Sequence, residues 1–272
     1  MSTPLSSIRF GRLLMTGAAG GLGRAMRPRL KAYCETLRLS DIAGMGSAAA
    51  GEELVVAQLG DAAAVHSLLA DVEAVVHFGG ISTEKDWGTI LDANIVGVYN
   101  LYEAARRHRV KRIVFASSNH VTGFYRQDQV ISPLDPVRPD GFYGLSKAFG
   151  ENLSRFYFDR YGIETVCLRI GSSFPEPRDR RMLATWLSYD DLERLLAAAL
   201  TAPIVGHSVI YGMSDNATVW WDNTAARHVG YRPQDSSEPF RAEVEACQQR
   251  IDLDDPAAIY QGGAFVRQGS AG

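Results

Sequence analysis

The sequence predicts an α/β fold built on a doubly wound parallel sheet. Short apolar segments alternate with amphipathic segments of helical period along the first two thirds of the chain. A glycine-rich loop joins the first apolar segment to the first amphipathic one. The 272 residues, 46% of them hydrophobic, suffice to bury the core of one large domain. Because strands that alternate with helices form parallel sheets with right-handed connections, we expect this class.

Six strands are expected before residue 174, each followed by a loop or a helical segment. They cover residues 12–16, 35–39, 53–58, 74–78, 112–116 and 165–170. Most are rich in apolar residues, as the buried strands of a parallel sheet are. Between them the spacing of apolar residues predicts helices. The expected helices cover residues 24–32, 62–69, 92–108 and 144–161.

The glycine-rich loop LLMTGAAGGLG is the strongest single motif. Gly17 can adopt a conformation that other residues avoid, Gly20 lets the chain approach a pyrophosphate, and Gly23 lets a helix pack close to a strand. The free N–H groups at the start of that helix attract an anion. This predicts a dinucleotide site of the Rossmann type, although the spacing also fits a turn that binds no ligand. The expected cofactor contacts here are Gly17, Gly20, Gly21, Leu22 and Gly23.

Asp41 ends the second expected strand, 18 residues after Gly23. An acid at this place of a βαβ unit accepts hydrogen bonds from the adenosine ribose. Its charge repels a 2′-phosphate and no arginine follows closely, so NAD is favoured over NADP; a turn or helix cap is the alternative role. Gly79 and Gly80 end the fourth strand and are expected to let the backbone approach the cofactor. A plain turn fits them equally well.

Tyr143 and Lys147 stand four residues apart on an expected helix, so their side chains share one face. A phenol has a pKa of about 10, which a nearby ammonium and a positive nicotinamide ring would lower. Such a tyrosine can take a proton from an alcohol. Ser118 follows the fifth strand, at the sheet edge where ligands bind, and can hydrogen-bond the reacting oxygen. By itself, this pair also fits an ordinary helix surface.

Composition argues against several other classes of protein. The formal net charge is −3 and adjacent basic residues come only in pairs, so neither nucleic acid nor a membrane is an expected partner. No apolar stretch approaches the roughly 18 residues of a membrane span, and residues 1–7 lack a signal-peptide core. Cys34, Cys167 and Cys247 are widely spaced, which favours the cytoplasm over a disulfide framework. No residues have metal-ligand spacing, so no metal is expected.

Three motifs, TGAAGGLG, SSNHVTG and YGLSK, resemble those of the extended short-chain dehydrogenase/reductase family, which includes NAD-dependent epimerases and dehydratases. Asn94 fits the central helix of the same family. The resemblance extends over residues 12–173. It implies Tyr143 as the catalytic proton acceptor and Ser118 as the residue that orients the substrate oxygen. It also implies that Lys147 lowers the tyrosine pKa and holds the nicotinamide ribose.

Further segments resemble the uronate dehydrogenase family along the whole chain. They are HFGGIS at 77–82, ASSNH at 116–120, RIGSSFPEP at 169–177, RML at 181–183, WWDN at 220–223 and QGGAFV at 261–266. The resemblance implies NAD-dependent oxidation of the C1 hydroxyl of a cyclic hexuronate to the aldaric acid lactone. It leaves open whether D-glucuronate or D-galacturonate is preferred, since the two differ only at C4.

A hexuronate carries a carboxylate, which an arginine guanidinium binds with two parallel hydrogen bonds. Arg181 is the matching residue, and Arg178 and Arg180 are close rivals. The resemblance implies that the sugar contacts Ser82, Ser118, Asn119, His120, Tyr143, Ser172 and Arg181, and that Phe265 closes over its ring. It assigns to the cofactor Leu59, Gly79, Gly80, Asn94, Lys147 and Ser173.

Two segments depart from the family pattern. Gln58-Leu59 stands where relatives commonly carry Asp-Leu, whose carboxylate receives the adenine amino group, so a weaker adenine contact is expected. Val121-Thr122-Gly123 replaces a tyrosine-bearing motif of the nucleotide-sugar enzymes, which favours the uronate branch. A nucleotide-sugar epimerase or dehydratase and a non-catalytic NAD-sensing protein are the alternative functions.

The chain after residue 173 loses the regular alternation. A helix is expected at 189–200, a strand at 205–211 and the start of another helix at 220–223. No linker marks a clean boundary. We therefore expect residues 1–173 to form an NAD-binding Rossmann domain with the catalytic residues, and 174–272 a small C-terminal substrate-binding lobe that is not an independent domain. Long helices such as 92–108 commonly pair in this family, so a homo-oligomer is expected.

Overall fold

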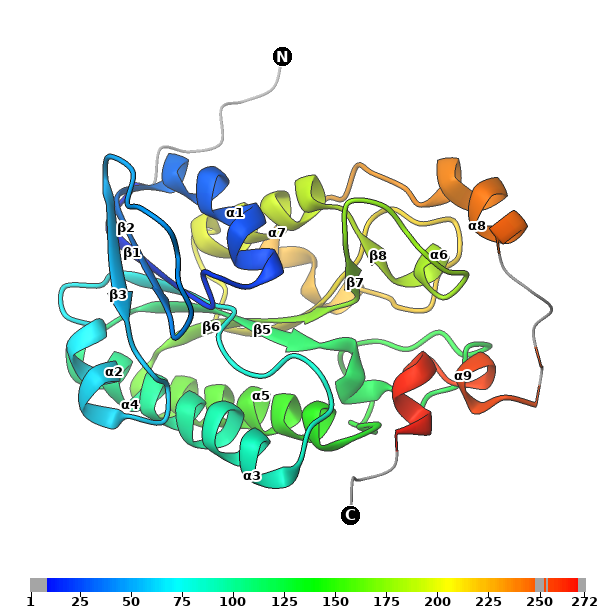
Figure 1. The fold of residues 1–272 in the computed structure, drawn as a ribbon, viewed down its shortest axis with the longest axis horizontal. Helices are drawn as coiled ribbons and strands as arrows, with labels where there is room; N and C mark the ends of the chain where they lie inside the picture. The colour runs from blue at the N-terminus through cyan, green and yellow to red at the C-terminus, as the bar shows by residue number, and fades with distance from the viewer. Residues whose placement is uncertain (1–8, 248–251, 253, 269–272) are drawn as a thin grey trace.

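A seven-stranded parallel sheet forms the centre of the molecule (Figure 1). The structure, a computed structural model, describes residues 9–247, 252 and 254–268, and residues 1–7 lie outside this part. The strand order, β3-β2-β1-β4-β5-β6-β9, confirms the predicted doubly wound sheet. The strands are β1 (Phe10–Thr16), β2 (Cys34–Asp41), β3 (Glu52–Val56), β4 (Ala74–His77), β5 (Arg112–Ser118), β6 (Glu164–Ile170) and β9 (His207–Gly212).

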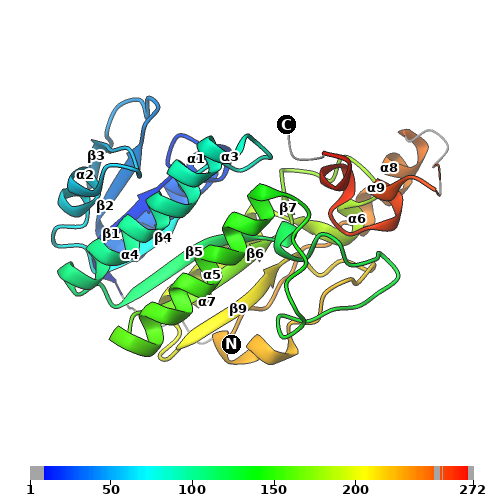
Figure 2. The same cartoon turned by 90° about the horizontal axis from the view of Figure 1, so that it is seen from below.

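Helices cover both faces of the sheet, as Figures 1 and 2 show. Successive side chains of a strand point to opposite faces, so Leu13 and Met15 belong to one core cluster and Leu14 to the other. All three are fully buried, which explains the continuous apolar runs in the sequence. One face carries α1 (Gly21–Leu30) and α7 (Tyr189–Thr201), and the other carries α2 (Ala62–Leu68), α4 (Gly97–His108) and α5 (Phe142–Tyr161).

The carboxyl ends of the strands meet at one edge of the sheet. The register pairs Thr16 of β1 with Ser40 of β2 and with His77 of β4. β2 and β4 thus lie on opposite sides of β1, which makes this the point where the strand order reverses. Ligands of open α/β sheets bind at such a point. Farther along the same edge, Ser118 of β5 pairs with Ile170 of β6.

The helix predicted over 92–108 begins earlier and is not uniform. It starts with α3 (Trp87–Ile90), because the Asp86 side chain accepts a hydrogen bond from the Thr89 N–H and caps the first turn. The π-helical segment η2 (Leu91–Val96) then leads into α4. Its wider turn holds the buried Asn94. π-Helical turns are frequent at functional sites.

The helix predicted to open at 220–223 begins later, as the 3-10 helix η4 (Thr224–Val229). Trp221 instead pairs with Ile131 in an isolated β-bridge. Its ring is fully buried and stacks on Tyr211, with 4.8 Å between ring centres. Packing of the large aromatic ring therefore decides the local structure here, rather than helical propensity.

The C-terminal segment, residues 254–268, lies against the loop that follows β5. Gln261 N–H donates to the Tyr125 carbonyl and Gly262 N–H to the Gly123 carbonyl, both at 2.8 Å. Within the described residues, no helix is long and apolar enough to cross a membrane. The remaining short elements are η1 (Lys31–Tyr33), η3 (Asn119–Thr122), β7 (Ser172–Ser173), α6 (Met182–Thr185), β8 (Trp186–Leu187), η5 (Glu238–Phe240), α8 (Arg241–Cys247), α9 (Pro256–Ile259) and η6 (Gly263–Arg267).

Candidate active site

The glycine-rich loop between β1 and α1 has the geometry of an anion site. Gly17 has a φ of +71°, which favours glycine, and a Cβ there would lie 2.6 Å from the Phe78 carbonyl carbon. A Cβ at Gly23 would lie 2.7 Å from the Ala18 Cα, so only glycine lets α1 begin this close to the strand. Gly20 is the N-cap of α1 and offers no side-chain cap. The N–H groups of the first helical turn are therefore suited to an anionic ligand.

Asp41 is held beside this loop at the end of β2. Its Oδ2 accepts a hydrogen bond from the Ala19 N–H at 2.9 Å, and its Oδ1 accepts one from the Ala43 N–H at 3.0 Å. The side chain is half-buried. The structure thus brings the acid and the loop together, and the contact of Asp41 with a ribose stays a prediction.

Asn94 fixes the loop that follows β4. Its Oδ1 accepts a hydrogen bond from the Ile81 N–H at 2.8 Å, while its Nδ2 donates to the Ile81 carbonyl and to Ser146 Oγ. Gly80 has a φ of +118°, and a Cβ there would lie 2.6 Å from Asn94 Oδ1. Gly79 N–H donates to Thr16 Oγ1 at 3.1 Å. Asn94 therefore shapes the Gly79-Gly80 loop through contacts within the protein.

The other residues expected at the cofactor lie along the same edge of the sheet or just beyond it. A Cβ added at Gly79 would lie 3.0 Å from Leu59 Cδ1, so this leucine packs under the loop. Gln58 Nε2 donates to Asp92 Oδ2 at 3.3 Å, so its amide is engaged with an acid of η2. Ser173 lies in β7, and its buried Oγ has no hydrogen-bond partner among the described residues.

Tyr143 and Ser118 meet where α5 begins and β5 ends. Tyr143 is 7% exposed and shares a side-chain hydrogen bond with Ser118. Burial raises the pKa of Tyr143 to about 12, and the hydrogen bond with Ser118 lowers it by a smaller amount. The groups of the chain itself therefore do not produce the lowered pKa that the sequence predicts.

Lys147 lies one turn along α5, on the predicted face. Its Nζ donates to the Ala116 carbonyl at 2.9 Å and lies 5.7 Å from the centre of the Tyr143 ring. Burial lowers the pKa of Lys147 to about 8. The ammonium is held by the backbone of β5 rather than by the phenol. This explains why it does not offset the effect of burial on the Tyr143 pKa.

The guanidinium of Arg181 is held by neutral partners. Its Nε donates to the Gln261 carbonyl at 2.7 Å and its Nη1 to Ser172 Oγ at 3.1 Å. Nη2 donates to Asn119 Oδ1 at 2.5 Å when the Asn119 amide is oriented to satisfy both of its groups. Burial lowers the pKa of Arg181. Among the described residues, no Asp or Glu forms an ion pair with it.

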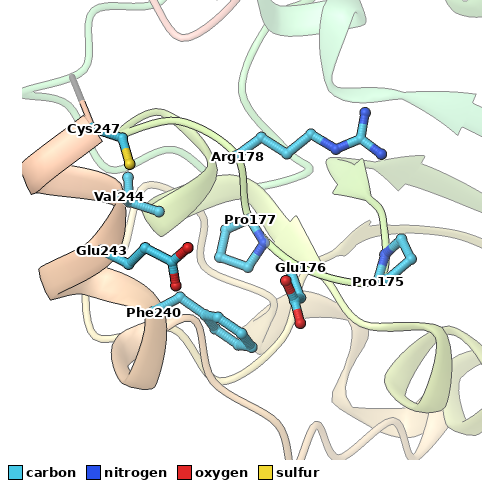
Figure 3. Close-up of a pocket in the computed structure, with 8 residues that line it drawn as sticks. All are labelled: Pro175, Glu176, Pro177, Arg178, Phe240, Glu243, Val244 and Cys247. Atoms are coloured by element: carbon cyan, nitrogen blue, oxygen red, sulfur yellow. The ribbon is translucent and has the colours of Figure 1, made fainter. Parts of the chain in front are cut away.

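The rival arginines are placed differently. Arg178 and Arg180 are exposed, whereas Arg181 is half-buried. Arg178 lies 4.2 Å from the centre of the Phe174 ring and lines a pocket between the loop before α6 and the helix α8 (Figure 3). The structure therefore brings Arg181 to the other expected substrate residues. The residues that line the pocket of Figure 3 are Pro175, Glu176, Pro177, Arg178, Phe240, Glu243, Val244 and Cys247.

His120 lies between Tyr143 and the C-terminal segment. Its ring stacks on Phe265 with 3.8 Å between centres and meets the Tyr143 ring edge-on at 5.8 Å. Its Nδ1 lies 2.7 Å from Asp140 Oδ2. Burial lowers the pKa of His120, so its imidazole is neutral at neutral pH. Ser82 is exposed on the loop after β4, and no side-chain contact joins it to these residues.

Sequence reasoning missed three buried or half-buried residues of this site. The Glu84 carboxylate accepts hydrogen bonds from the backbone at the start of α5, Asp140 contacts His120, and the Gln261 carbonyl receives Arg181. Each contacts a residue distant in the sequence, so the local spacing of residues does not reveal its role. The only signal was that Gln261 begins the segment QGGAFV, which resembles the uronate dehydrogenases.

Known proteins are similar to this chain over almost its whole length. The model of the NAD dependent epimerase/dehydratase family matches residues 13–201. A uronate dehydrogenase of Pseudomonas putida is 59% identical over 97% of this chain and 99% of its own length. One of Pseudomonas syringae pv. tomato is 60% identical over 97% of this chain and 96% of its own length.

A solved structure has the same fold. The uronate dehydrogenase from Agrobacterium tumefaciens, in a mutant form complexed with NAD, is 48% identical and has a TM-score of 0.94. The match covers 96% of this chain and 98% of that one. The chain therefore belongs to the NAD dependent epimerase/dehydratase family and, within it, to the uronate dehydrogenases.

Proposed function

We propose that this protein is an NAD-dependent dehydrogenase that oxidises the C1 hydroxyl of a cyclic hexuronate, D-glucuronate or D-galacturonate, to the aldaric acid lactone. Relatives that are 50% to 60% identical are named uronate dehydrogenases. The observation that carries the proposal is the Arg181 guanidinium, which neutral partners hold near Asn119 and Ser172. A half-buried guanidinium whose partners are all neutral is stabilised by an anionic group of a ligand, and the carboxylate of a hexuronate is such a group.

The residues present fit NAD. The missing side chains at Gly17 and Gly23 let the loop and α1 pack closely, the position beside Gly21 is open, and the uncapped N-terminus of α1 suits a pyrophosphate. Asp41, held beside the loop, is proposed to accept hydrogen bonds from the adenosine ribose. NAD, when bound, supplies the acceptor for the hydride that leaves C1 of the sugar. We assign to the cofactor Gly17, Gly20, Gly21, Leu22, Gly23, Asp41, Leu59, Gly79, Gly80, Asn94, Lys147 and Ser173.

Tyr143 is the proposed base. It acts as the phenolate, a form that the positive nicotinamide of bound NAD would favour against the effect of burial on the Tyr143 pKa. As the C1–H bond breaks and its electron pair leaves with the hydrogen, the hydroxyl proton passes to the phenolate oxygen of Tyr143. C1 then carries a carbonyl beside the unchanged ring oxygen, which is a lactone. Ser118, which hydrogen-bonds the tyrosine, is proposed to orient the same substrate oxygen. Lys147, with a pKa of about 8, is largely protonated at neutral pH and adds positive charge near the phenol.

The substrate carboxylate is proposed to bind Arg181, with Ser82, Asn119, His120 and Ser172 at the sugar hydroxyls and Phe265 over the ring. The contacts of Phe265 with His120 and Tyr143 support this arrangement, because they bring its ring to two of the proposed site residues. We keep the proposal that residues 174–272 hold the substrate without forming an independent domain, since β9 belongs to the central sheet. A homo-oligomer in the cytoplasm also remains our proposal.

The proposed function is tested by NADH formation, followed by absorbance, with glucuronate, galacturonate, glucose and UDP-glucose. We expect turnover of both hexuronates because each carries the carboxylate that Arg181 binds. Glucose has the same C1 hydroxyl but lacks that carboxylate, so it should react poorly. Equal activity on glucose and glucuronate would contradict the role of Arg181. Preference for UDP-glucose would favour a nucleotide-sugar enzyme.

A further inference from the structure

The carboxylate of Asp140 has no part in the steps above, yet it is fully buried beside the site. Its Oδ2 lies 2.7 Å from His120 Nδ1, and its side chain has no exposed surface. Its Oδ1 has no hydrogen-bond partner among the described residues. A buried carboxylate with a single partner is costly to the fold. Its charge also interacts with the Arg181 guanidinium, but the contact with His120 is its one side-chain hydrogen bond among the described residues.

Three glycines from distant segments surround this carboxylate. Gly123 follows η3, Gly144 lies in the first turn of α5, and Gly262 belongs to the C-terminal segment. A Cβ at Gly123 or Gly262 would overlap Asp140 Oδ2, and one at Gly144 would overlap the His120 carbonyl oxygen and lie 3.2 Å from Asp140 Oδ1. The chain thus leaves out a side chain at two places to accommodate the carboxylate, and at a third to let α5 approach the backbone of His120. The surrounding backbone is thus shaped to hold the Asp140 carboxylate at this position.

The contact determines which nitrogen of His120 carries the hydrogen. An ionised carboxylate only accepts hydrogen bonds, so Nδ1 must donate to Asp140. In a neutral imidazole the other nitrogen, Nε2, then carries a lone pair. The ring cannot turn freely, because it stacks on Phe265 and meets Tyr143 edge-on. Nε2 therefore has a fixed direction and a fixed role as a hydrogen-bond acceptor.

We propose that Asp140 is a positioning residue of this active site, which holds His120 as the Nδ1–H tautomer and so presents Nε2 as the acceptor for a hydroxyl of the sugar. This inference rests on the proposed function, because it takes the ligand to be a hexuronate. A guanidinium only donates, so Arg181 suits the carboxylate and cannot accept from a hydroxyl. Together, Arg181 and His120 match the two kinds of polar group that a hexuronate offers.

The tautomer can be observed without any substrate. Long-range ¹H–¹⁵N spectra of histidine-labelled protein distinguish the two neutral tautomers, and the signals lost in His120→Gln identify His120. We expect the Nδ1–H tautomer in the wild type. In Asp140→Asn we expect a mixture or the Nε2–H form, because an amide at residue 140 can donate as well as accept. A wild-type His120 in the Nε2–H form would overturn the proposal.

A double-mutant cycle tests the effect on the reaction. Asp140→Asn should lower kcat/KM for the hexuronate by about tenfold to a hundredfold, the usual cost of a lost hydrogen bond to a charged group, with the Kd for NAD unchanged. In a His120→Gln background the same change should cost less than about threefold, because Asp140 acts through His120. Equal losses in both backgrounds would refute this role.

Asp191→Asn is a matched structural control. Asp191, in the first turn of α7, is also fully buried. Its carboxylate accepts hydrogen bonds from the N–H groups of Gln234 and Asp235, which lie in a loop later in the chain. This variant should lower the melting temperature and leave kcat/KM unchanged. A wild type that oxidises no hexuronate would contradict the proposed function. An active wild type with equal losses in the two backgrounds would contradict only the role of Asp140.

Discussion

The Glu84 carboxylate accepts a hydrogen bond from the backbone N–H of Tyr143 at 2.9 Å and another from that of Phe142 at 2.8 Å. The N-cap of α5 is Gly141, which has no side chain to cap the helix. A residue of the loop after β4 thus takes over the capping of the helix that carries the proposed base. The contact links the loop expected at the cofactor to the position of Tyr143.

Replacing Glu84 should affect both stability and catalysis. Glu84→Ala removes the cap and should lower the free energy of unfolding by about 0.5–2 kcal/mol. It should also lower kcat, because the first turn of α5, which positions Tyr143, loses its anchor. Glu84→Gln keeps one acceptor oxygen and should lose less of each. Denaturant unfolding and NADH formation measure the two effects. A less stable Glu84→Ala with full kcat would show that the cap does not position Tyr143.

The central sheet was predictable because its signals are local. Apolar runs such as RIVFA in β5 and the glycine-rich loop after β1 each carry their information within a few residues. Boundaries that depend on distant partners were not predictable. α5 begins two residues before the predicted start at 144, where the distant Glu84 caps it. Trp221 enters a β-bridge with Ile131 rather than the predicted helix.

The candidate site divides in the same way. Tyr143 and Lys147 could be paired from their spacing, because a helix fixes the relation of residues four apart. Asp140 and Gln261 contact residues far from them in the sequence, His120 and Arg181, so no local sequence pattern predicts these contacts. The Tyr143 pKa could not be predicted either, because the sequence indicates neighbours but not the degree of burial. Burial is the largest cause of its rise to about 12.

Tyr143→Phe should abolish turnover while NAD still binds. The substitution removes the proposed proton acceptor and keeps the ring that packs against His120. Titration with NAD and NADH formation separate the two properties. Tyr125→Phe is a matched control, because the Tyr125 hydroxyl donates to the Pro136 carbonyl rather than to a site residue. Appreciable residual turnover in Tyr143→Phe would remove it as the base.

Arg181→Ala should raise the KM for hexuronates at least tenfold, because a hydrogen bond to a charged group contributes about 1.5–3 kcal/mol. The Kd for NAD should change little. Arg178→Ala and Arg180→Ala are the controls, since both residues are exposed in the same loop. An unchanged KM in Arg181→Ala, with a raised one in either control, would move the carboxylate site to that arginine.

Lys147→Met should abolish activity and stabilise the fold at neutral pH. Burial lowers the pKa of Lys147 from 10.5 to about 8, so the folded state releases this proton more easily than the unfolded state. Between pH 8 and 10.5 the unfolded state therefore binds more protons, and the free energy of unfolding rises with pH. Below pH 8 the charged lysine imposes its full cost, on the order of 3 kcal/mol.

Denaturant unfolding of the wild type and Lys147→Met at several pH values measures this cost. The methionine variant should be the more stable of the two at pH 7, and the difference should shrink as the pH rises toward 10.5. Loss of the hydrogen bond to the Ala116 carbonyl acts in the opposite direction and reduces the gain. A variant that is less stable than the wild type at every pH would contradict the prediction.

His77 should make the fold sensitive to acid. Its ring is fully buried at the end of β4. Nδ1 lies 2.7 Å from Thr16 Oγ1, and Nε2 has no hydrogen-bond partner among the described residues. Burial, and then the charge of Lys147, lower the pKa of His77 to about 3. Between pH 6.5 and 3 the unfolded state therefore binds the extra proton, and stability falls as the pH falls, by up to about 1.4 kcal/mol per pH unit.

His77→Gln removes this titration and keeps a group that can hydrogen-bond Thr16. Its acid-unfolding midpoint, followed by circular dichroism, should lie at a lower pH than that of the wild type. His66→Gln, at an exposed position, is the control and should leave the midpoint where it is. The buried ring resists protonation because charging it would place a cation in an apolar core already close to Lys147. If His77→Gln and the wild type unfold at the same pH, another group governs the acid transition.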